Sequence, residues 1–173
     1  ESEIKNIITM VKTLLESESI NYQQFWLHKR SHGQHRPLCL IDDQWKENVE
    51  AFWVEEAGVK IRIHLGDRYD YGIYTDMAGI RHDMYQMHPL FRGKSVLNLF
   101  SYTGAYSVIA LKHGATFCCS LDSSKKYLQI LEENLSHNEL LNEKHRFMEQ
   151  DFFKGLKQLQ EKKNLFDLVI LDP

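Results

Sequence analysis

The sequence lacks the cysteine and histidine patterns of a metal or redox site. Its three cysteines, Cys39, Cys118 and Cys119, form no CxxC pair and no disulfide framework. Its nine histidines show no HExxH or other paired metal spacing. Metal catalysis therefore has no support, and no metal site is expected. An odd number of cysteines, two of them adjacent, favours packed thiols in a reducing, cytoplasmic setting.

The chain also lacks long hydrophobic runs and an excess of positive charge. No stretch approaches the roughly 18 apolar residues of a membrane span, and no signal segment opens the chain. We therefore expect no membrane partner. The net charge of −3 excludes a global basic field, so any contact with nucleic acid must be local. A length of 173 residues allows one sizeable core with a small accessory unit.

One local concentration of positive charge lies between residues 28 and 36. It contains Lys29, Arg30 and Arg36, three histidines and one glycine, and it has no acidic residue. A solvated loop would explain this composition. Clusters of Lys and Arg are also how proteins hold phosphate backbones, so RNA binding by these three residues is the second interpretation.

The first half of the chain predicts a small α+β unit. Apolar residues recur at helical spacing over residues 3–17, which predicts an amphipathic helix. From Val49 the period changes to two, and intervening turns separate three runs that predict an antiparallel meander, its third strand spanning 69–75. A helix that contains Arg81 follows. We expect one domain over residues 1–85 and a second over residues 86–173.

The second half predicts an α/β fold. Strand patterns alternate with helical patterns, the strands over 95–100, 116–121, 145–149 and 166–171 and the helices over 105–112, 124–135 and from 152 onward. This alternation predicts a parallel sheet with right-handed connections. The last strand is apolar throughout, as in a sheet covered on both faces, and the chain ends two residues later. We therefore expect a longer protein in which further strands follow the fourth.

Polar residues fall at the carboxyl ends of all four strands, the edge where such sheets bind ligands. After the first strand, Gly104 would let backbone N–H groups approach a ligand, or would permit tight helix packing. Ser101 and Thr103 add hydroxyl groups. The turn has one glycine and no G-x-G-x-x-G fingerprint, so a cofactor without phosphates fits it better than a dinucleotide.

Three aspartates follow the other strands. Asp122 can accept hydrogen bonds from both hydroxyls of a ribose, or it can cap the next helix. Asp151 can accept from an adenine amino group, or cap the helix that begins at Phe152. Asp172, before Pro173, would hold a carboxylate beside the reacting groups, or would simply end a strand. Independent caps need not share one edge of a sheet, so together these residues favour a nucleoside-bearing cofactor.

Residues 94–108 resemble motif I of class I S-adenosylmethionine-dependent methyltransferases. They look most like the RlmI/RlmK-like branch that methylates 23S ribosomal RNA, with its N-L-F-x-Y-T-G signature. Four shorter segments resemble other parts of this family. Residues 120–124 resemble motif II, residues 150–153 resemble motif III, and residues 171–173 resemble the start of the D-P-P motif IV. Residues 72–76 resemble the strand that precedes the methyltransferase core. The resemblance covers about residues 50–173.

The resemblance implies a Rossmann-like core, preceded by a small α+β unit, that binds S-adenosylmethionine. It implies that residues 100–104 embrace the methionine part, Asp122 the ribose and Asp151 the adenine. The full implied cofactor site consists of Asn98, Phe100, Ser101, Tyr102, Thr103, Gly104, Asp122, Ser123, Asp151, Phe152, Thr75, Asp76 and Arg81. Asp172 and Pro173 would border the methyl group as the catalytic residues. Where many relatives have D-Q-R, this chain has residues 76–78 as D-M-A, so only Arg81 can supply the later arginine.

The implied activity is methylation of an RNA base, with 23S ribosomal RNA as the expected substrate and a homodimer left open. A cysteine nucleophile of the kind used to make 5-methylcytosine would lie beyond Pro173. Without the resemblance, the residues also allow two functions other than methylation. A NAD-dependent oxidoreductase would share the Asp122 contact, although the missing glycines count against it. A non-catalytic Rossmann-like module would bind a partner through the N-terminal helix and the meander.

Overall fold

The computed structural model describes residues 2–21, 25–27, 38–41, 44–46, 51–64 and 71–173. Contacts between Cα atoms divide the chain into two compact units, residues 1–49 with 66–68, and residues 50–65 with 69–173. This division differs from the expected boundary after residue 85. The boundary lies earlier in the chain because Val59, Ile61 and Met84 all pack into the main hydrophobic core of the second unit.

The first unit contains α1 (Ser2–Ser17) and an antiparallel sheet in the order β1 (Phe25–Leu27), β2 (Leu38–Ile41) and β3 (Gln44–Lys46). The helix confirms the expectation from the apolar spacing of residues 3–17. The sheet was not expected, because strands of three or four residues are too short for a period-two pattern to be recognised. No helix in the described ranges is long and apolar enough to cross a membrane.

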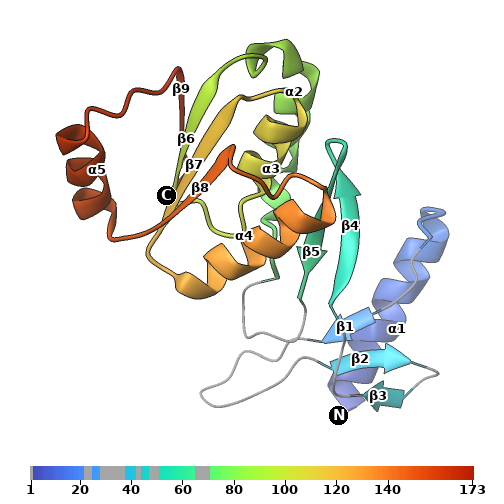
Figure 1. Cartoon of the computed structure of the whole chain (residues 1–173). Coiled ribbons are helices and arrows are strands. Elements are labelled where there is room, and N and C mark those ends of the chain that lie inside the picture. The colour runs from blue at the N-terminus through green and yellow to red at the C-terminus, as the bar shows by residue number, and fades with distance from the viewer. Residues whose placement is uncertain (1, 22–24, 28–37, 42–43, 47–50, 65–70) are drawn as a thin grey trace. The chain divides into compact units, whose positions relative to one another are not determined.

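The second unit is built on a parallel sheet, as expected (Figure 1). Its strands are β6 (Ser95–Leu99), β7 (Phe117–Asp122), β8 (His145–Glu149) and β9 (Leu168–Leu171), in the spatial order β8-β7-β6-β9. Leu99 pairs with Leu121 on one side and with Leu171 on the other. The carboxyl ends of the strands therefore share one edge of the sheet.

Three helices cover the two faces of this sheet, namely α3 (Ala105–Lys112), α4 (Lys125–His137) and α5 (Phe152–Glu161). Val96 of β6 points into a core cluster with Leu131 of α4, whereas the next residue, Leu97, points into a second cluster with Leu159 of α5. The α5 helix accordingly lies on the opposite side of the sheet from α3 and α4 (Figure 1). This doubly wound arrangement confirms the predicted fold class.

A β-hairpin of β4 (Phe52–Glu56) and β5 (Val59–Ile63) precedes the sheet, followed by η1 (Thr75–Met77), α2 (Ala78–Gln86) and η2 (His88–Leu90). The helix expected around Arg81 is confirmed as α2. The third strand expected over residues 69–75 is wrong for its described part, residues 71–75. There Gly72 has a φ of 97°, and its N–H and C=O groups bind side chains instead of a neighbouring strand.

Asn134 of α4 and Asn138, the residue that follows the last residue of α4, bind the outer edge of β5. Asn138 accepts a hydrogen bond from Lys60 N at 2.9 Å and donates one to the Lys60 carbonyl oxygen at 2.7 Å. Asn134 accepts from Arg62 N at 2.9 Å and donates to the Thr103 carbonyl oxygen at 2.8 Å. A single helix therefore holds both the hairpin and the turn that follows β6.

A row of buried polar side chains crosses the sheet from β6 to β8. Asn98 Nδ2 donates to Ser107 Oγ at 2.9 Å, Ser107 Oγ bonds Ser120 Oγ at 2.6 Å, and Ser120 Oγ bonds His145 Nε2 at 2.8 Å. Burial lowers the pKa of His145 to about 4, so its imidazole is neutral at neutral pH. Burial also raises the pKa of the Cys118 thiol to about 12, which confirms Cys118 as a packed thiol.

Candidate cofactor site

The turn after β6 has an unusual backbone. Phe100 and Tyr102 adopt left-handed φ angles of 54° and 50°, and Gly104 adopts 78°. Such angles cost non-glycine residues on the order of 1–3 kcal/mol each and are concentrated at functional sites. Two backbone bonds hold the turn, from Ser101 N to the Leu121 carbonyl oxygen at 3.0 Å and from Gly104 N to the Ser101 carbonyl oxygen at 2.8 Å.

Asp122, the last residue of β7, ties this turn to the next strand. Its Oδ2 accepts from Tyr102 N and its Oδ1 accepts from Ser124 N, both at 2.8 Å. Each carboxylate oxygen has two lone pairs, so both can still accept from a ligand hydroxyl. The cap of α4 is Ser124, whose Oγ accepts from Tyr127 N. Asp122 is therefore not the helix cap, and its carboxylate remains available as an acceptor.

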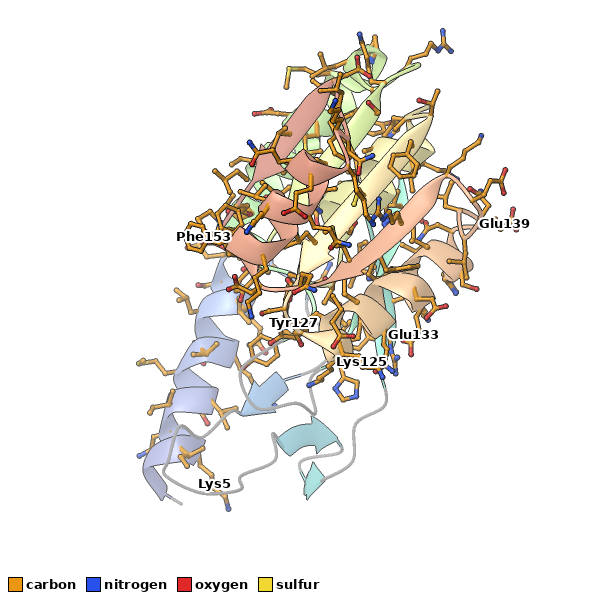
Figure 2. The ribbon with its side chains drawn as sticks, turned by 60° about the vertical axis from the view of Figure 1, so that its left-hand side comes forward. Lys5, Lys125, Tyr127, Glu133, Glu139 and Phe153 are labelled. Carbon is orange, nitrogen blue, oxygen red and sulfur yellow. The ribbon has the colours of Figure 1, made fainter. Side chains whose placement is uncertain are left out.

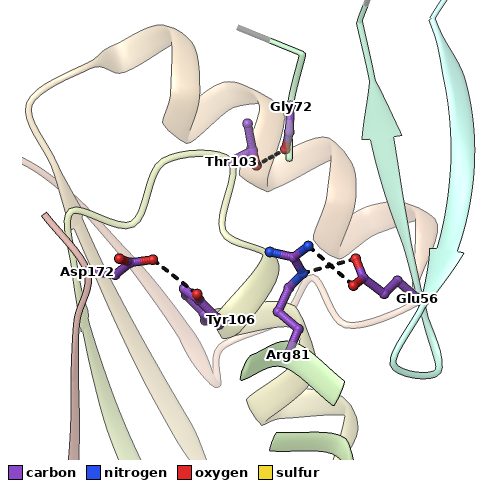
Figure 3. Close-up of polar contacts among 6 residues, drawn as sticks. All are labelled: Glu56, Gly72, Arg81, Thr103, Tyr106 and Asp172. Carbon is purple, nitrogen blue, oxygen red and sulfur yellow. Dashed lines mark hydrogen bonds and ion pairs between the residues drawn. The ribbon is translucent and has the colours of Figure 1, made fainter. Parts of the chain in front are cut away.

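Tyr102 and Thr103 join the turn to the segment before α2. Gly72 N donates to the Tyr102 hydroxyl at 3.1 Å, and the buried Thr103 hydroxyl donates to the Gly72 carbonyl oxygen (Figure 3). The Tyr102 ring lies against Tyr74 and edge-on to Tyr127, with centroids 5.0 and 4.5 Å apart. One wall of the site is therefore aromatic and cross-linked by hydrogen bonds.

Gly104 serves the packing role that was one of its two interpretations. A Cβ atom at this position would lie 2.0 Å from Cδ1 of Leu131, a fully buried residue of α4. The left-handed φ adds a second reason for glycine. The close approach is made to a helix, and Gly104 itself lines neither hollow described below.

Asp172 lies at the end of β9 and accepts a hydrogen bond from the Tyr106 hydroxyl at 3.0 Å (Figure 3). Burial and the Asp172 carboxylate raise the pKa of Tyr106 to about 12, although the nearby Arg81 guanidinium opposes the shift. Arg81 is only 3% exposed and forms two hydrogen bonds with Glu56 of β4, from Nε at 3.0 Å and from Nη2 at 3.2 Å. The four side chains form a polar layer from the hairpin to the sheet edge.

Two adjoining hollows open at this edge. Their cavity volumes are about 50 and 410 Å³, and the larger falls in the size range of small-molecule sites. Both are lined by Tyr74, Met77, Phe100, Tyr102 and Asp172. The larger adds Asp76, Asp122 and Pro173, and the smaller adds Ile73, Arg81, Ser101, Thr103, Ala105 and Tyr106. The sheet edge thus brings together nine of the predicted site residues, namely Phe100, Ser101, Tyr102, Thr103, Asp122, Asp76, Arg81, Asp172 and Pro173.

Other predicted site residues line neither hollow, namely Asn98, Gly104, Thr75, Ser123, Asp151 and Phe152. Asn98 is fully buried in the polar row under α3. Asp151 caps α5 by accepting from Lys154 N at 3.2 Å. Phe152 stacks on Phe100 with ring centroids 4.7 Å apart, and so extends the aromatic wall toward Phe153, which is 76% exposed (Figure 2). Lys29, Arg30 and Arg36 lie outside the described residues.

Sequence reasoning missed Tyr74, Met77 and Tyr106, which all line the smaller hollow. Tyr74 falls in the segment that is predicted to be a strand, where an aromatic residue indicates packing, and no sequence pattern marks Met77 as a site residue. Tyr106 stands 66 residues from its partner Asp172, and no local pattern reports that contact.

The residues at this edge fit S-adenosylmethionine. Asp122 offers acceptors for ribose hydroxyls, and the carboxylates of Asp122 and Asp172 suit a cationic sulfonium. Ser101 Oγ is buried and, among the described residues, has no hydrogen-bond partner, which leaves a polar atom for a ligand at the wall of the smaller hollow. The turn between Phe100 and Gly104 carries no run of glycines for a pyrophosphate.

A family model for S-adenosylmethionine-dependent methyltransferases matches residues 20–173. Ribosomal RNA large subunit methyltransferase I of Pseudoalteromonas translucida is 36% identical over 120 residues, which are 69% of this chain and 30% of that protein. Ribosomal RNA large subunit methyltransferase K/L of Aeromonas hydrophila is 29% identical over 171 residues, 98% of this chain and 22% of that protein. The chain thus spans less than a third of the length of either relative.

Solved structures agree with this match. A methyltransferase from Streptococcus mutans has a TM-score of 0.66 and 31% identity, with 74% of this chain and 34% of that chain covered. Another, in complex with S-adenosylhomocysteine, has a TM-score of 0.66 and 31% identity, with coverage of 74% and 33%. These matches favour a methyltransferase over a NAD-dependent oxidoreductase or an interaction module. The chain therefore belongs to the S-adenosylmethionine-dependent methyltransferase family, and S-adenosylmethionine is its cofactor.

Proposed function

We propose that the chain is the cofactor-binding part of a cytoplasmic enzyme that methylates a base of RNA, with 23S ribosomal RNA as the substrate. The observation that carries this proposal is the pair of hollows at one sheet edge, bounded by Asp122 on one side and Asp172 on the other. The curated relatives named above support RNA as the substrate class, because both are called ribosomal RNA methyltransferases.

Each side chain has a positioning role in this proposal. Asp122 accepts from the ribose hydroxyls, the strained turn from Phe100 to Gly104 surrounds the methionine part, and Asp151 with Phe152 borders the adenine. When bound, S-adenosylmethionine supplies an electrophilic methyl group on a sulfonium. Asp172 and Pro173 line the edge that a target base would approach, and a base within a helix must be flipped out to reach it.

The segment before α2 completes the proposed site. Asp76 lines the larger hollow and can accept from the cofactor, with Thr75 beside it in the same turn of 3-10 helix. Arg81 lines the smaller hollow, but its guanidinium is already bound by Glu56. We therefore assign Arg81 to holding the wall of the site and to a contact through its remaining N–H groups.

A homodimer, which the sequence leaves open, is a separate proposal. Light scattering coupled to size-exclusion chromatography of the full-length protein tests it, because a dimer has twice the mass of the monomer. A monomeric mass at micromolar concentration would remove the homodimer.

Calorimetric titration with S-adenosylhomocysteine, and with NAD as the control ligand, tests the cofactor site in the full-length protein. We expect binding of S-adenosylhomocysteine alone. Asp122→Asn should weaken it by on the order of tenfold, because an amide offers one acceptor oxygen in place of two. Asp83→Asn, on the exposed side of α2, is the matched control and should change nothing. Binding of NAD alone, or of neither ligand by folded protein, would contradict the proposal.

A further inference from the structure

Tyr106 is a polar side chain of the smaller hollow to which the proposed function gives no role. It lies in the first turn of α3, and its hydroxyl donates to Oδ2 of Asp172 at 3.0 Å. Within the described part of the chain, Oδ1 of Asp172 accepts no hydrogen bond, and Asp172 lines both hollows. The Tyr106 bond therefore fixes one carboxylate oxygen and leaves the other for a ligand.

The protonation state of Tyr106 suits a permanent donor. Burial is the main reason that its pKa rises to about 12, and the hydrogen bond to Asp172 adds to the rise. The phenol therefore keeps its proton throughout the physiological pH range. A phenol that keeps its proton is not a general base at neutral pH, and the hydrogen bond to Asp172 gives Tyr106 a geometric role.

Arg81 leaves that proton no other acceptor on its side of the ring. The Arg81 guanidinium lowers the pKa of Tyr106, although less than burial raises it. A guanidinium group has no acceptor atom, so the phenol proton cannot be donated to Arg81 and is donated to Asp172. Glu56 holds Arg81 in this position with two hydrogen bonds, at 3.0 and 3.2 Å (Figure 3).

We propose that Tyr106 is a positioning residue that orients the Asp172 carboxylate toward the cationic sulfonium of the cofactor and the incoming base. This inference rests on the proposed function, because Asp172 has a ligand only if the hollows bind S-adenosylmethionine. A carboxylate held in one rotamer interacts with a nearby cation more favourably than one that samples several. The orienting bond should therefore favour the charged cofactor over its neutral product.

The test compares affinities for S-adenosylmethionine, a sulfonium cation, and S-adenosylhomocysteine, a neutral thioether, in the full-length protein by calorimetry. Tyr106→Phe removes one oxygen and keeps the ring. We expect the dissociation constant for S-adenosylmethionine to rise about fivefold and that for S-adenosylhomocysteine to change less than about twofold. In an Asp172→Asn background, Tyr106→Phe should change the ratio of the two constants by less than about twofold.

Tyr85→Phe is the matched control. Tyr85 lies on α2, packs edge-on to His113 and lines neither hollow, so this substitution should leave both dissociation constants unchanged. If Tyr106→Phe raises both dissociation constants equally and lowers the melting temperature, the hydrogen bond only stabilises the packing of α3 against β9. That result would overturn the inference. Failure of the folded wild type to bind either ligand would overturn the proposed function as well.

Discussion

The hydroxyl of Thr103 donates a hydrogen bond of 2.5 Å to the carbonyl oxygen of Gly72. The N–H group of the same glycine donates to the hydroxyl of Tyr102, so both polar groups of one backbone residue are bound by adjacent side chains of the cofactor turn. A Cβ atom on Gly72 would lie 2.4 Å from the carbonyl oxygen of Arg62. This position therefore has no room for a side chain, and the wall of the site depends on it.

Gly72→Ala should lower the free energy of unfolding by about 2 kcal/mol or more, because it combines a backbone clash with a left-handed φ of 97°. Urea unfolding followed by circular dichroism measures the change. Gly79→Ala is the control, since its Cβ would have no neighbour within 4 Å in α2. It should be neutral or stabilising by roughly 0.5–1 kcal/mol. Equal effects at both positions would contradict the role given to Gly72.

Gly104→Ala tests whether the cofactor turn is set by packing or by backbone angle. Gly93 has nearly the same φ, 76° against 78°, but its Cβ would have no neighbour within 4 Å. Gly93→Ala should cost only about 1–2 kcal/mol for the left-handed angle. Gly104→Ala should cost at least about 1 kcal/mol more, because its Cβ would meet Leu131. Identical losses in thermal unfolding would show that packing against Leu131 is unimportant.

Glu56→Gln should destabilise the protein by about 1–2 kcal/mol, because it leaves the buried Arg81 guanidinium with a neutral partner. The loss stays below that of a fully buried pair, since the Glu56 side chain is 26% exposed. Glu55→Gln, at the adjacent exposed position of β4, should change the free energy by less than about 0.5 kcal/mol. Chemical denaturation of both variants separates the ion pair from a general effect of charge in the hairpin.

His145 should make the protein sensitive to acid. Its pKa is about 4 in the folded state and 6.5 in the unfolded chain, so between these values the unfolded state binds more protons. Stability from this group is fully present above about pH 6.5 and falls by roughly 3 kcal/mol as the pH decreases toward 4. His145→Gln should flatten the slope of stability against pH in that window. His82→Gln, at an exposed position of α2, should leave the slope unchanged.

Changing Lys29, Arg30 and Arg36 together to alanine should weaken RNA binding and reduce its dependence on salt. Each lost phosphate contact lowers the slope of log K against log salt by about 0.7–0.9, so the slope should fall by roughly 2–3. Fluorescence anisotropy with a fragment of 23S ribosomal RNA across a salt series measures it. The control changes three exposed lysines of the α5 end, Lys157, Lys162 and Lys163. If both triple variants behave alike, the basic segment has no special role.

The sequence predicted those parts of the fold that depend on local patterns. The helix expected over residues 105–112 matches α3 because Gly104 and Gly114, both with positive φ, bracket it. The strand expected over 145–149 has the same bounds as β8. The edge that collects Asp122 and Asp172 also followed from the sequence, because parallel strands bring their carboxyl ends together.

What the sequence could not predict were contacts between distant residues. The alternation around Gly72 is typical of a strand, but its backbone groups bind Tyr102 and Thr103, which lie 30 and 31 residues away. Asn98 falls inside the motif I signature, yet its side-chain amide donates a hydrogen bond to Ser107 in the buried polar row. Only three-dimensional packing decides such competition between possible partners.

The two asparagines at the C-terminal end of α4, Asn134 and the capping residue Asn138, also affect whether this protein can pair with other chains. An unpaired strand edge can recruit a foreign strand and seed aggregation. On β5 that edge is occupied, since Asn138 binds Lys60, Asn134 binds Arg62, and His64 N donates to the carbonyl oxygen of Tyr71. The β5 edge of the hairpin is thereby closed to strand exchange, because two side-chain amides take the place of a further strand.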